Sequence, residues 1–367
     1  MRINHFITTI SRGGAENQLL ILCREQIASG HEVSVTPLKG QLELLDEFES
    51  ENIRVDLSFH GKNFLLQVIR KTVTNWKKNE IQHAHLPQAE LLLAMSLQRE
   101  YFSTRHYGSA FFPGKSLHLS RLLSRLAATR ATKIIAISRF VAEYLVESRE
   151  IGDNNKIIVV QYGFDASKFP SSFQQSSPPE PPFHNPLRVG TLARLSPEKD
   201  LTTLIRGFSI FCNSTARLST LEIFGDGPER DLLEKLISKL DMKDKVFLMG
   251  KTSRPAKVLS DIDIFVLPSK FEGFGMVFLE AMATSRIILA SNTPAAIEVL
   301  GRDGAAIFFE VGNDLDLSLK LSDVLDINLD NMRAEQSKRL ELFRANVMSN
   351  CIQRVYEENS RFLLSPL

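Results

Sequence analysis

The sequence predicts an α/β protein built from two domains, and three observations support this fold class. Short apolar segments alternate with helical patterns along the chain, which is typical of βα units around a parallel sheet. A length of 367 residues exceeds one ordinary core and fits two domains of roughly 150 to 200 residues each. The segment 171–186 is rich in Ser, Gln and Pro, which predicts a linker. We therefore expect a cleft between the two domains.

The first half of the chain carries the first βα series. A strand, a Gly-containing turn and a helix that closes at Gly30 are expected in this order. The apolar segments that predict strands are 3–10, 31–38, 81–87, 101–108, 133–138 and 156–163. The predicted first domain spans 1–170.

The second series follows the linker and is expected to span 187–349. Its predicted strands are 187–195, 219–227, 245–250, 263–269, 286–291 and 305–311, and its predicted helices include 200–211, 228–240 and 273–283. The tail from about 331 to 362 also has a helical pattern. We expect its last part, about 350–367, to pack back onto the first domain.

Composition indicates an ordinary globular protein, with 43% hydrophobic and 24% charged residues. No run of about 18 apolar residues occurs and the start lacks the pattern of a signal peptide, so neither a membrane span nor secretion is expected. Cys23, Cys212 and Cys351 are odd in number and far apart, which argues against a disulfide framework or a zinc knuckle. A cytoplasmic location is the simplest expectation.

Charge is concentrated in one block of the chain. Residues 61–140 carry thirteen Lys or Arg residues against three Glu, a net charge of +10. Segments 61–79 and 115–133 predict basic helices with Leu-rich faces. These helices suit peripheral binding to an anionic membrane, on its inner face, and a lipid-linked acceptor. Ordinary packing of the Leu faces is an equally good reading. A nucleic-acid partner is not expected, because the aromatic residues needed for stacking are absent.

The strongest candidate site lies at 263–283. A buried strand ends at Pro268 and Ser269, a Gly-containing turn follows, and a helix is expected to begin near Gly275. Ligands of parallel α/β sheets bind at the carboxyl ends of the strands. Amides at the helix N-terminus would then form an anion site suited to phosphate, and those amides belong to Gly273, Phe274, Gly275 and Met276.

Two carboxylates flank this turn. Glu272 precedes the helix and Glu280 lies inside it, so they are separated by about 8 Å along the helix axis. Carboxylates accept hydrogen bonds from hydroxyl pairs, which a nucleotide sugar carries on its ribose and on its sugar. The alternative is a surface loop acid and a solvated helix residue.

Two cations and a glycine turn add to the candidate site. Arg194 and Lys199 follow the strand at 187–195, and both could reach a diphosphate and stabilise a leaving nucleoside diphosphate. Gly225 follows the strand at 219–227, where a small residue lets a ligand approach the backbone. A solvated turn would explain the two cations, and turn chemistry would explain the glycine equally well.

These motifs together resemble the retaining family 4 glycosyltransferases, which have the GT-B fold of two facing Rossmann-like domains. Arg194 and Lys199 resemble the diphosphate-binding cations of that family, and Glu272 to Glu280 resembles its E-x7-E motif. The segments GGAE, TRHYG, IIAISRF, VVQYGFD and IFGDGPER also resemble family segments. The resemblance covers about residues 7–310.

The resemblance implies roles for individual residues. Glu272 would contact the transferred sugar and Glu280 the ribose hydroxyls. His106 would touch the donor sugar from the opposite domain, and Gly14 would let the first loop approach the phosphates or the acceptor. The implied reaction retains the anomeric configuration, and a role in bacterial cell-surface polysaccharide or lipopolysaccharide synthesis follows at the family level.

The sequence departs from the family in the donor domain. Ser285 stands where the family usually has Gly, and Pro294 and Ala295 stand where it has a glycine pair. Proline has no amide hydrogen to donate. A differently shaped donor pocket is therefore expected.

We expect neither a metal nor a cofactor, because Arg194 and Lys199 already supply positive charge. Asp261 and Asp263 form a D-x-D pattern but lead into a strand, so we interpret them as a helix-to-strand junction. His83 and His85 share a strand face, yet no third metal ligand is evident from spacing.

Of four other functions, the sequence excludes two and leaves two open. The turn after the first strand lacks the G-x-G-x-x-G of a nicotinamide dehydrogenase. A glycosidase would not need a phosphate site. A nucleotide-sugar epimerase and a non-catalytic scaffold that binds sugar nucleotides remain open.

Overall fold

The computed structural model describes residues 1–73, 80–96, 100–112, 114, 116–169, 183–324 and 329–360. The chain forms two compact units. Unit 1 comprises Met1–Asp165 together with Phe343–Leu367, and unit 2 comprises Ala166–Leu342. Each unit has its own parallel sheet and its own core.

Unit 1 contains a seven-stranded parallel sheet in the order β3-β2-β1-β4-β5-β6-β7. Its strands are β1 Arg2–Ile7, β2 Glu32–Pro37, β3 Arg54–Val55, β4 Glu80–His85, β5 Phe102–Arg105, β6 Lys133–Ala136 and β7 Ile157–Val159. Its helices are α1 Gly14–Ala28, α2 Leu45–Ser50, α3 Phe64–Val73, α4 Pro87–Met95, α5 Leu117–Arg130, α6 Arg139–Glu147 and α14 Ala345–Asn359. The chain order of the strands reverses between β1 and β4, which are hydrogen-bonded neighbours.

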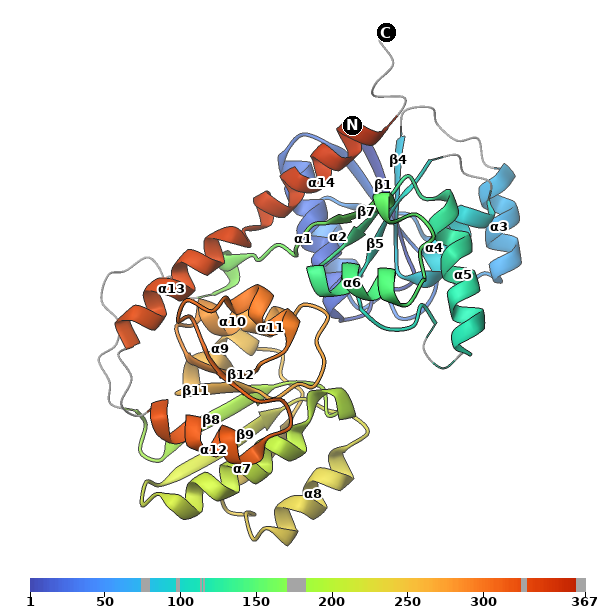
Figure 1. Ribbon diagram of the computed structural model, residues 1–367. Coiled ribbons are helices and arrows are strands. Elements are labelled where there is room, and N and C mark those ends of the chain that lie inside the picture. The colour runs from blue at the N-terminus through green and yellow to red at the C-terminus, as the bar shows by residue number, and fades with distance from the viewer. Residues whose placement is uncertain are drawn as a thin grey trace. The chain divides into compact units, whose positions relative to one another are not determined.

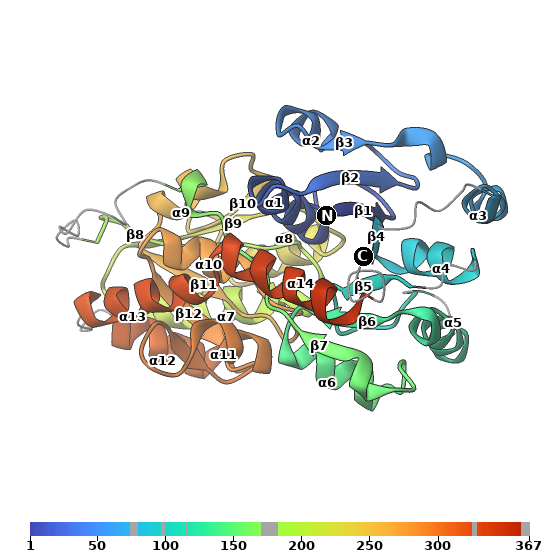
Figure 2. The ribbon, with the colours of Figure 1, turned by 90° about the horizontal axis from the view of Figure 1, so that it is seen from above.

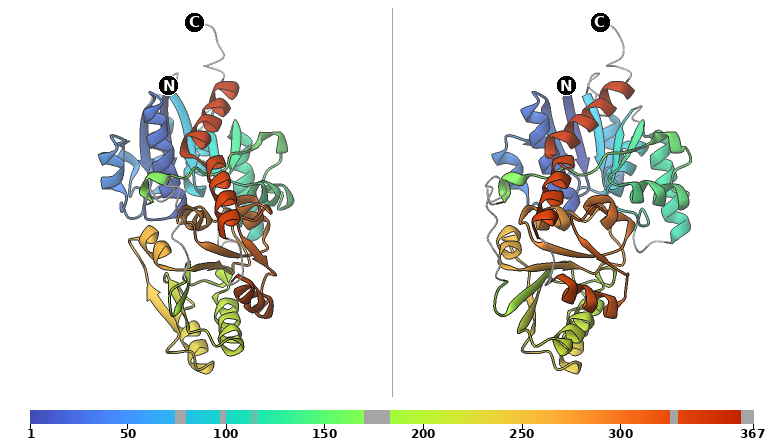
Figure 3. Two further views of the ribbon diagram at one scale, coloured as in Figure 1. Left: turned by 90° about the vertical axis from the view of Figure 1, so that its left-hand side faces the viewer. Right: turned by 60° about the vertical axis from the view of Figure 1, so that its left-hand side comes forward.

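Helices cover both faces of the first sheet. Helices α1 and α14 lie on one face, and α3, α4 and α5 lie on the other (Figure 2). The apolar side of α14 brings Met348, Ile352 and Val355 into a core that also contains Ile3 and Ile135. Two further views show α14 along the same side as α1 (Figure 3).

Unit 2 contains a six-stranded parallel sheet in the order β10-β9-β8-β11-β12-β13. Its strands are β8 Leu187–Leu192, β9 Ser219–Phe224, β10 Val246–Gly250, β11 Ile264–Leu267, β12 Ile287–Ser291 and β13 Ile307–Phe309. Its helices are α7 Leu201–Ser214, α8 Arg230–Lys239, α9 Pro255–Asp261, α10 Met276–Ala283, α11 Pro294–Leu300, α12 Asp314–Asp323 and α13 Leu329–Leu342.

The second sheet is also covered on both faces. Helices α7, α8 and α12 lie on one face, and α9, α10, α11 and α13 lie on the other (Figure 1). Its core is almost entirely aliphatic and aromatic, with Phe208, Phe211 and Ile264 fully buried. Strands β8 and β11 are paired although β9, β10 and the helices around them lie between the two in the sequence, so the strand order reverses at this pair.

The structure confirms the predicted α/β class and every predicted strand, and it adds one short edge strand, β3. The predicted domain limits differ from those observed. Unit 2 ends at Leu342 instead of 349, because α14 begins at Ala345 and its apolar side already belongs to the core of unit 1. Unit 2 also begins at Ala166, before the predicted linker at 171–186, most of which lies outside the described residues.

No helix among the described residues is long and apolar enough to cross a membrane. The predicted basic helices are present as α3 and α5, and residues 74–79 of the first segment lie outside the description.

Candidate functional site

The candidate site of unit 2 lies where β8 and β11 end side by side. Ile264 and Phe265 of β11 pair in parallel with Val189 and Gly190 of β8, so the loops that follow the two strands emerge at one sheet edge. This is the reversal point of the strand order, where ligands of such sheets bind. The loop after β8 carries Arg194 and Lys199, and the loop after β11 carries Glu272.

Lys199 and Glu272 meet across these two loops. Lys199 ends a short 3-10 helix, Pro197–Lys199, and its Nζ forms an ion pair with Oε1 of Glu272. The same carboxylate oxygen accepts a hydrogen bond of 3.0 Å from Oγ of Ser269. Glu272 is only 9% exposed, so its charge is held by partners rather than by water. The structure thus brings together two residues that lie far apart in the sequence.

Further contacts hold the two loops together. The Lys270 amide donates a hydrogen bond of 2.9 Å to the Glu198 carbonyl, and Lys270 Nζ lies 3.1 Å from Asp200 Oδ1. Asp200 has a left-handed backbone with φ of 48° and accepts a hydrogen bond of 2.8 Å from Thr203 Oγ1. No sequence signal identified Lys270 or Asp200, because their pairing depends on how the loops approach in space.

Helix α10 follows the loop of Glu272 and carries the second carboxylate. Gly275 precedes it with φ of 85°, and a Cβ there would lie 2.6 Å from the Phe278 ring. Among the described residues, no side chain pairs with the carboxylate of Glu280. Burial raises the pKa of Glu280 to about 7. An ionisable acceptor near neutrality is therefore available inside the first turns of α10.

Arg194 is exposed, and it borders an open groove together with Asp226, Gly227 and Lys251. The glycine turn after β9 packs against the loop of Arg194. Gly225 has φ of 143°, and a Cβ there would lie 1.9 Å from the carbonyl oxygen of Ala193. Close backbone packing therefore explains Gly225, and direct contact of Gly225 with a donor stays a prediction.

The two departures from the family pattern have local explanations. Ser285 follows α10 with φ of 51°, a left-handed conformation in which glycine is favoured, so glycine serves there as a helix end. Pro294 is the first residue of α11, where a missing amide hydrogen costs little, and the Thr293 side chain accepts a hydrogen bond from the Ala296 amide. Neither observation requires a reshaped pocket.

The D-x-D pattern has a structural role. Asp263 accepts hydrogen bonds from the amides of His184 and Arg188, and its side chain also pairs with the His184 ring. Asp261 pairs with Lys257 one turn earlier on α9. Asp263 therefore fastens the junction between α9 and β11, as predicted.

Unit 1 carries the predicted glycine loop and His106. Gly14 begins α1, and a Cβ added to it would meet no atom within 4 Å, so open space lies beside it. His106 directly follows β5 and is buried. Its neighbour Arg105 points to the other face of the sheet and forms buried ion pairs with Glu90 at 2.8 Å and Glu150 at 3.2 Å. These ion pairs anchor the end of β5 on the face of the sheet opposite to His106.

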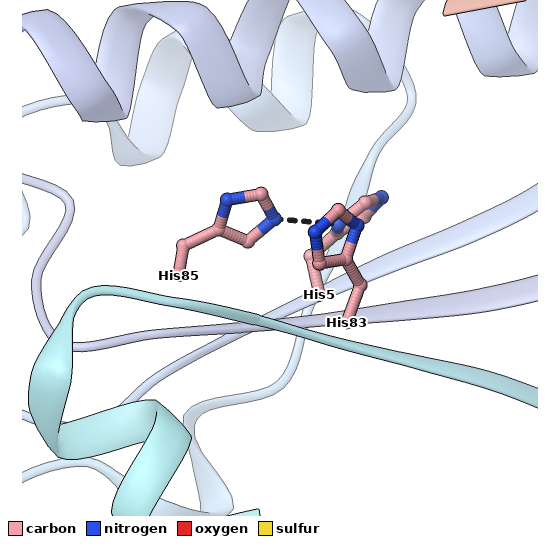
Figure 4. A group of neighbouring side chains, drawn as sticks. All are labelled: His5, His83 and His85. Carbon is pink, nitrogen blue, oxygen red and sulfur yellow. Dashed lines mark hydrogen bonds between the residues drawn. The ribbon is translucent and has the colours of Figure 1, made fainter. Parts of the chain in front are cut away.

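Three further histidines lie beneath His106. His5 of β1 pairs in register with His83 of β4, and His85 follows two residues later, so all three point to the face covered by α1 and α14 (Figure 4). His5 Nδ1 lies 3.0 Å from His85 Nε2, and His85 Nδ1 lies 3.2 Å from His106 Nε2. His5 is the third ring that spacing along the chain did not reveal.

Distance alone would allow His5, His83 and His85 to hold a metal, because one ligand atom of each lies within 4.8 Å of the others. Their geometry does not fit. The rings of His83 and His85 lie face to face at a tilt, with centroids 4.2 Å apart and planes at 31°, while ring nitrogens bind a metal in the ring plane. Both nitrogens of His83 also have partners, Tyr356 at 2.6 Å and Thr104 at 2.8 Å. The cluster is therefore a hydrogen-bonded array.

Two family models match the chain. The model described as Glycosyltransferase Family 4 matches residues 12–168, and the model described as Glycosyl transferases group 1 matches residues 172–341. The structure of Anabaena HepE in complex with UDP superposes with a TM-score of 0.80 at 19% identity and covers 98% of this chain and 100% of that one. The fold is GT-B. The chain belongs to the group 1 and family 4 glycosyltransferases.

Curated relatives align over parts of their length. The N-acetylgalactosamine-N,N'-diacetylbacillosaminyl-diphospho-undecaprenol 4-alpha-N-acetylgalactosaminyltransferase of Campylobacter jejuni is 31% identical over 37% of this chain and 36% of its own. The Staphylococcus aureus capsular polysaccharide biosynthesis glycosyltransferase CapM is 25% identical over 56% of this chain and 55% of its own. The chain thus spans about half the length, or less, of these two relatives.

Proposed function

We propose that this protein transfers a sugar from a nucleoside-diphosphate sugar to an acceptor hydroxyl, with retention at the anomeric carbon and without a metal ion. The observation that carries the proposal is the meeting of Lys199 and Glu272 at the reversal point of the second sheet, with the unpaired carboxylate of Glu280 on the following helix. A UDP complex is known for HepE, which has the same fold. UDP-sugars are therefore the first donors to test.

The ion pair gives both charges a partner that a bound donor could replace. Lys199 neutralises Glu272, and a diphosphate would give Lys199 a second anionic partner. Glu272 would then accept hydrogen bonds from the hydroxyls of the transferred sugar, and Glu280 would accept them from the ribose. Amides of Gly273, Phe274 and Met276 would contribute to binding of the phosphates.

The proposed transfer breaks the bond between the anomeric carbon and the phosphate oxygen. Arg194 and Lys199 would stabilise the charge that develops on the leaving nucleoside diphosphate. The acceptor hydroxyl would attack from the same face, and the leaving phosphate oxygen would take its proton. Retention then follows without a nucleophilic carboxylate.

Product formation with donor and acceptor together tests this function. The protein is incubated with UDP-, GDP- or ADP-sugars, alone and with polyprenyl-diphosphate-linked saccharides, and released nucleoside diphosphate is measured. We expect release that depends on both substrates. Conversion of the donor without an acceptor would instead indicate an epimerase, and binding without any conversion would indicate a scaffold.

A second part of the proposal concerns where the acceptor is met. Helices α3 and α5 bury polar side chains and expose apolar ones, the reverse of an ordinary amphipathic helix. The side chains that α3 buries include Gln67 and Lys71, while Leu65 is 63% and Val73 is 76% exposed. Helix α5 buries Ser120, Ser124, Ala127 and Ala128, and it exposes four of its five leucines, Leu117, Leu119, Leu122 and Leu126. Most of the leucine side chains of the two helices are therefore not packed in the core of unit 1.

Basic side chains accompany the exposed leucines. Lys62 and Arg70 are exposed beside α3, and Arg125 and Arg130 are exposed on α5. Both helices lie on the same face of the first sheet, on either side of α4 (Figure 2). Apolar side chains with flanking cations suit an anionic membrane surface and hence a lipid-linked acceptor for a cell-surface polysaccharide or lipopolysaccharide. A peripheral position on the inner face of the membrane follows.

Sedimentation with phosphatidylglycerol vesicles tests the membrane surface. We expect binding that weakens with salt and that Leu65→Gln reduces about tenfold, because one buried leucine contributes roughly 1.5 kcal/mol. Leu319→Gln is the matched control, since Leu319 is also 63% exposed but lies on the acidic helix α12. Equal losses in both variants, or no vesicle binding, would contradict the membrane proposal.

A further inference from the structure

The buried histidines of unit 1 form a chain of hydrogen bonds that ends at His106. His5 Nε2 lies 2.8 Å from the amide oxygen of Gln26, and His5 Nδ1 lies 3.0 Å from His85 Nε2. His85 Nδ1 lies 3.2 Å from His106 Nε2, and His106 Nδ1 lies 2.5 Å from the hydroxyl of Tyr162. Every ring nitrogen of these three histidines therefore has one partner.

All three rings are neutral near pH 7. Burial lowers the pKa of His5 to about 4 and that of His106 to about 3, and burial together with the neighbouring rings lowers the pKa of His85 well below its ordinary value. A neutral imidazole has one N–H donor and one lone-pair acceptor. Each ring can thus donate only once and accept only once.

These restrictions fix the direction of the whole chain. The amide oxygen of Gln26 only accepts, so the hydrogen of His5 is on Nε2 and its Nδ1 accepts. His85 must then donate from Nε2 and accept at Nδ1. His106 in turn donates from Nε2, which leaves Nδ1 as its acceptor and makes Tyr162 the donor. A single group on α1 thereby determines the tautomer of a ring at the edge of the sheet.

We propose that Gln26, His5 and His85 are positioning residues that hold His106 in the tautomer with hydrogen on Nε2, so that Nδ1 accepts a hydrogen bond from a hydroxyl of the bound sugar. This inference rests on the proposed function, because it takes the bound ligand to be a sugar substrate of the proposed transfer. The sugar hydroxyl would replace the hydroxyl of Tyr162 at Nδ1. The ligand class that fits is a neutral sugar with a hydroxyl at this position, because a carboxylate there would face another acceptor.

The branch through His83 provides a control within the same array. His83 bonds to Tyr356 and to Thr104, and no hydrogen bond joins it to His5, His85 or His106 in the part of the chain that the structure describes. A change at Thr104 therefore disturbs a buried hydrogen bond of the same kind without interrupting the chain from Gln26 to His106.

Histidine NMR of the ligand-free protein tests the proposal. The eight histidines are labelled with ¹⁵N, and the two ring nitrogens of His106 are assigned by their loss in His106→Gln. We expect the wild-type signals of His106 to be those of the Nε2–H tautomer. Gln26→Met, which removes the acceptor at similar volume, is expected to give a mixture of tautomers, whereas Thr104→Val is expected to leave the tautomer unchanged.

Steady-state kinetics test whether the tautomer of His106 matters for function. Gln26→Met is expected to lower kcat/KM for the donor sugar about threefold to tenfold, the effect of one weakened hydrogen bond. The proposal would be overturned if wild-type His106 carried its hydrogen on Nδ1 or showed a mixture of tautomers. It would also be overturned if Gln26→Met left the tautomer of His106 unchanged. The wild-type spectrum decides even if Gln26→Met does not fold. Because the tautomer is measured without substrate, it is independent of whether the protein transfers sugars.

Discussion

The two units share a parallel α/β architecture but place their polar side chains differently. In unit 2 the ionisable residues stand on loops beyond the strand ends, where Lys199 and Glu272 form one ion pair and Arg194 is exposed. In unit 1 the polar residues lie within the sheet, where His5, His85 and their neighbours are buried and mutually bonded. The charged groups of unit 2 stand on loops, whereas the polar groups of unit 1 have buried partners, of which only Tyr162 at His106 is proposed to be exchanged for a ligand.

The difference suggests a division of labour. In the proposed function, the loops of unit 2 would provide the cations that stabilise the charge of a leaving diphosphate. The array of unit 1 would provide an acceptor for a sugar hydroxyl whose orientation and tautomer are set in advance. The comparison therefore predicts that changes in unit 1 act mainly on stability and positioning, while changes in unit 2 act mainly on rate and ligand affinity.

The largest expected effect is the loss of stability in Arg105→Met. This change leaves Glu90 and Glu150 buried without their cation, and breaking such a buried pair costs about 3 to 5 kcal/mol. Urea denaturation should show the loss in the free energy of unfolding. A loss below about 1 kcal/mol would show that the buried ions of unit 1 are not held as tightly as the comparison requires.

Lys199→Ala should reduce turnover about a hundredfold, which corresponds to about 3 kcal/mol of transition-state stabilisation by one charged donor. Steady-state kinetics with a nucleotide sugar and an acceptor measure it. Lys257→Ala is the control, because Lys257 pairs with Asp261 on the surface of α9. An unchanged kcat in Lys199→Ala would remove Lys199 from the proposed mechanism.

Glu280 gives a prediction about pH. The ionised carboxylate accepts hydrogen bonds from ribose hydroxyls better than the protonated one, and the pKa is raised to about 7. UDP affinity should therefore rise up to about tenfold more between pH 6 and pH 8 in the wild type than in Glu280→Gln. Titration of the nucleotide itself is common to both proteins and cancels in this ratio. Parallel pH profiles would exclude the ribose contact.

The same raised pKa determines the sign of a stability change. The folded protein binds more protons than the unfolded chain between the ordinary carboxyl pKa of 4.5 and about 7. The contribution of Glu280 to folding stability therefore falls as the pH rises through this window. Glu280→Gln should flatten that part of the stability profile, and chemical denaturation at several pH values measures the change.

The smallest effect is expected at Ser285. Its φ of 51° strains any side chain, so Ser285→Gly should raise the free energy of unfolding by about 1 kcal/mol. Ser285→Ala retains the Cβ and serves as the control, with no gain expected. If Ser285→Gly and Ser285→Ala were equally stable, the backbone of Ser285 would not be strained.

Much of this arrangement could be predicted from the sequence. Strand endings determine which residues meet at a parallel sheet edge, so Arg194, Lys199 and Glu272 could be assigned to one site. The third histidine could not, because the pairing of His5 with His83 depends on strand order. Periodicity identified α3 and α5 but not which face they bury. The left-handed conformation of Ser285 could not be predicted either, because serine rarely adopts it.

Thermal unfolding in the presence of nucleotide sugars tests the central claim, a donor site on the loops of unit 2, most directly. A ligand at 100 times its dissociation constant stabilises the folded state by about 2.7 kcal/mol. We predict that at least one of the UDP-, GDP- and ADP-sugars raises the melting temperature of the wild type and that Arg194→Ala combined with Lys199→Ala abolishes the rise. A wild type that none of these donors stabilises, or a rise that persists in the double variant, would contradict the account.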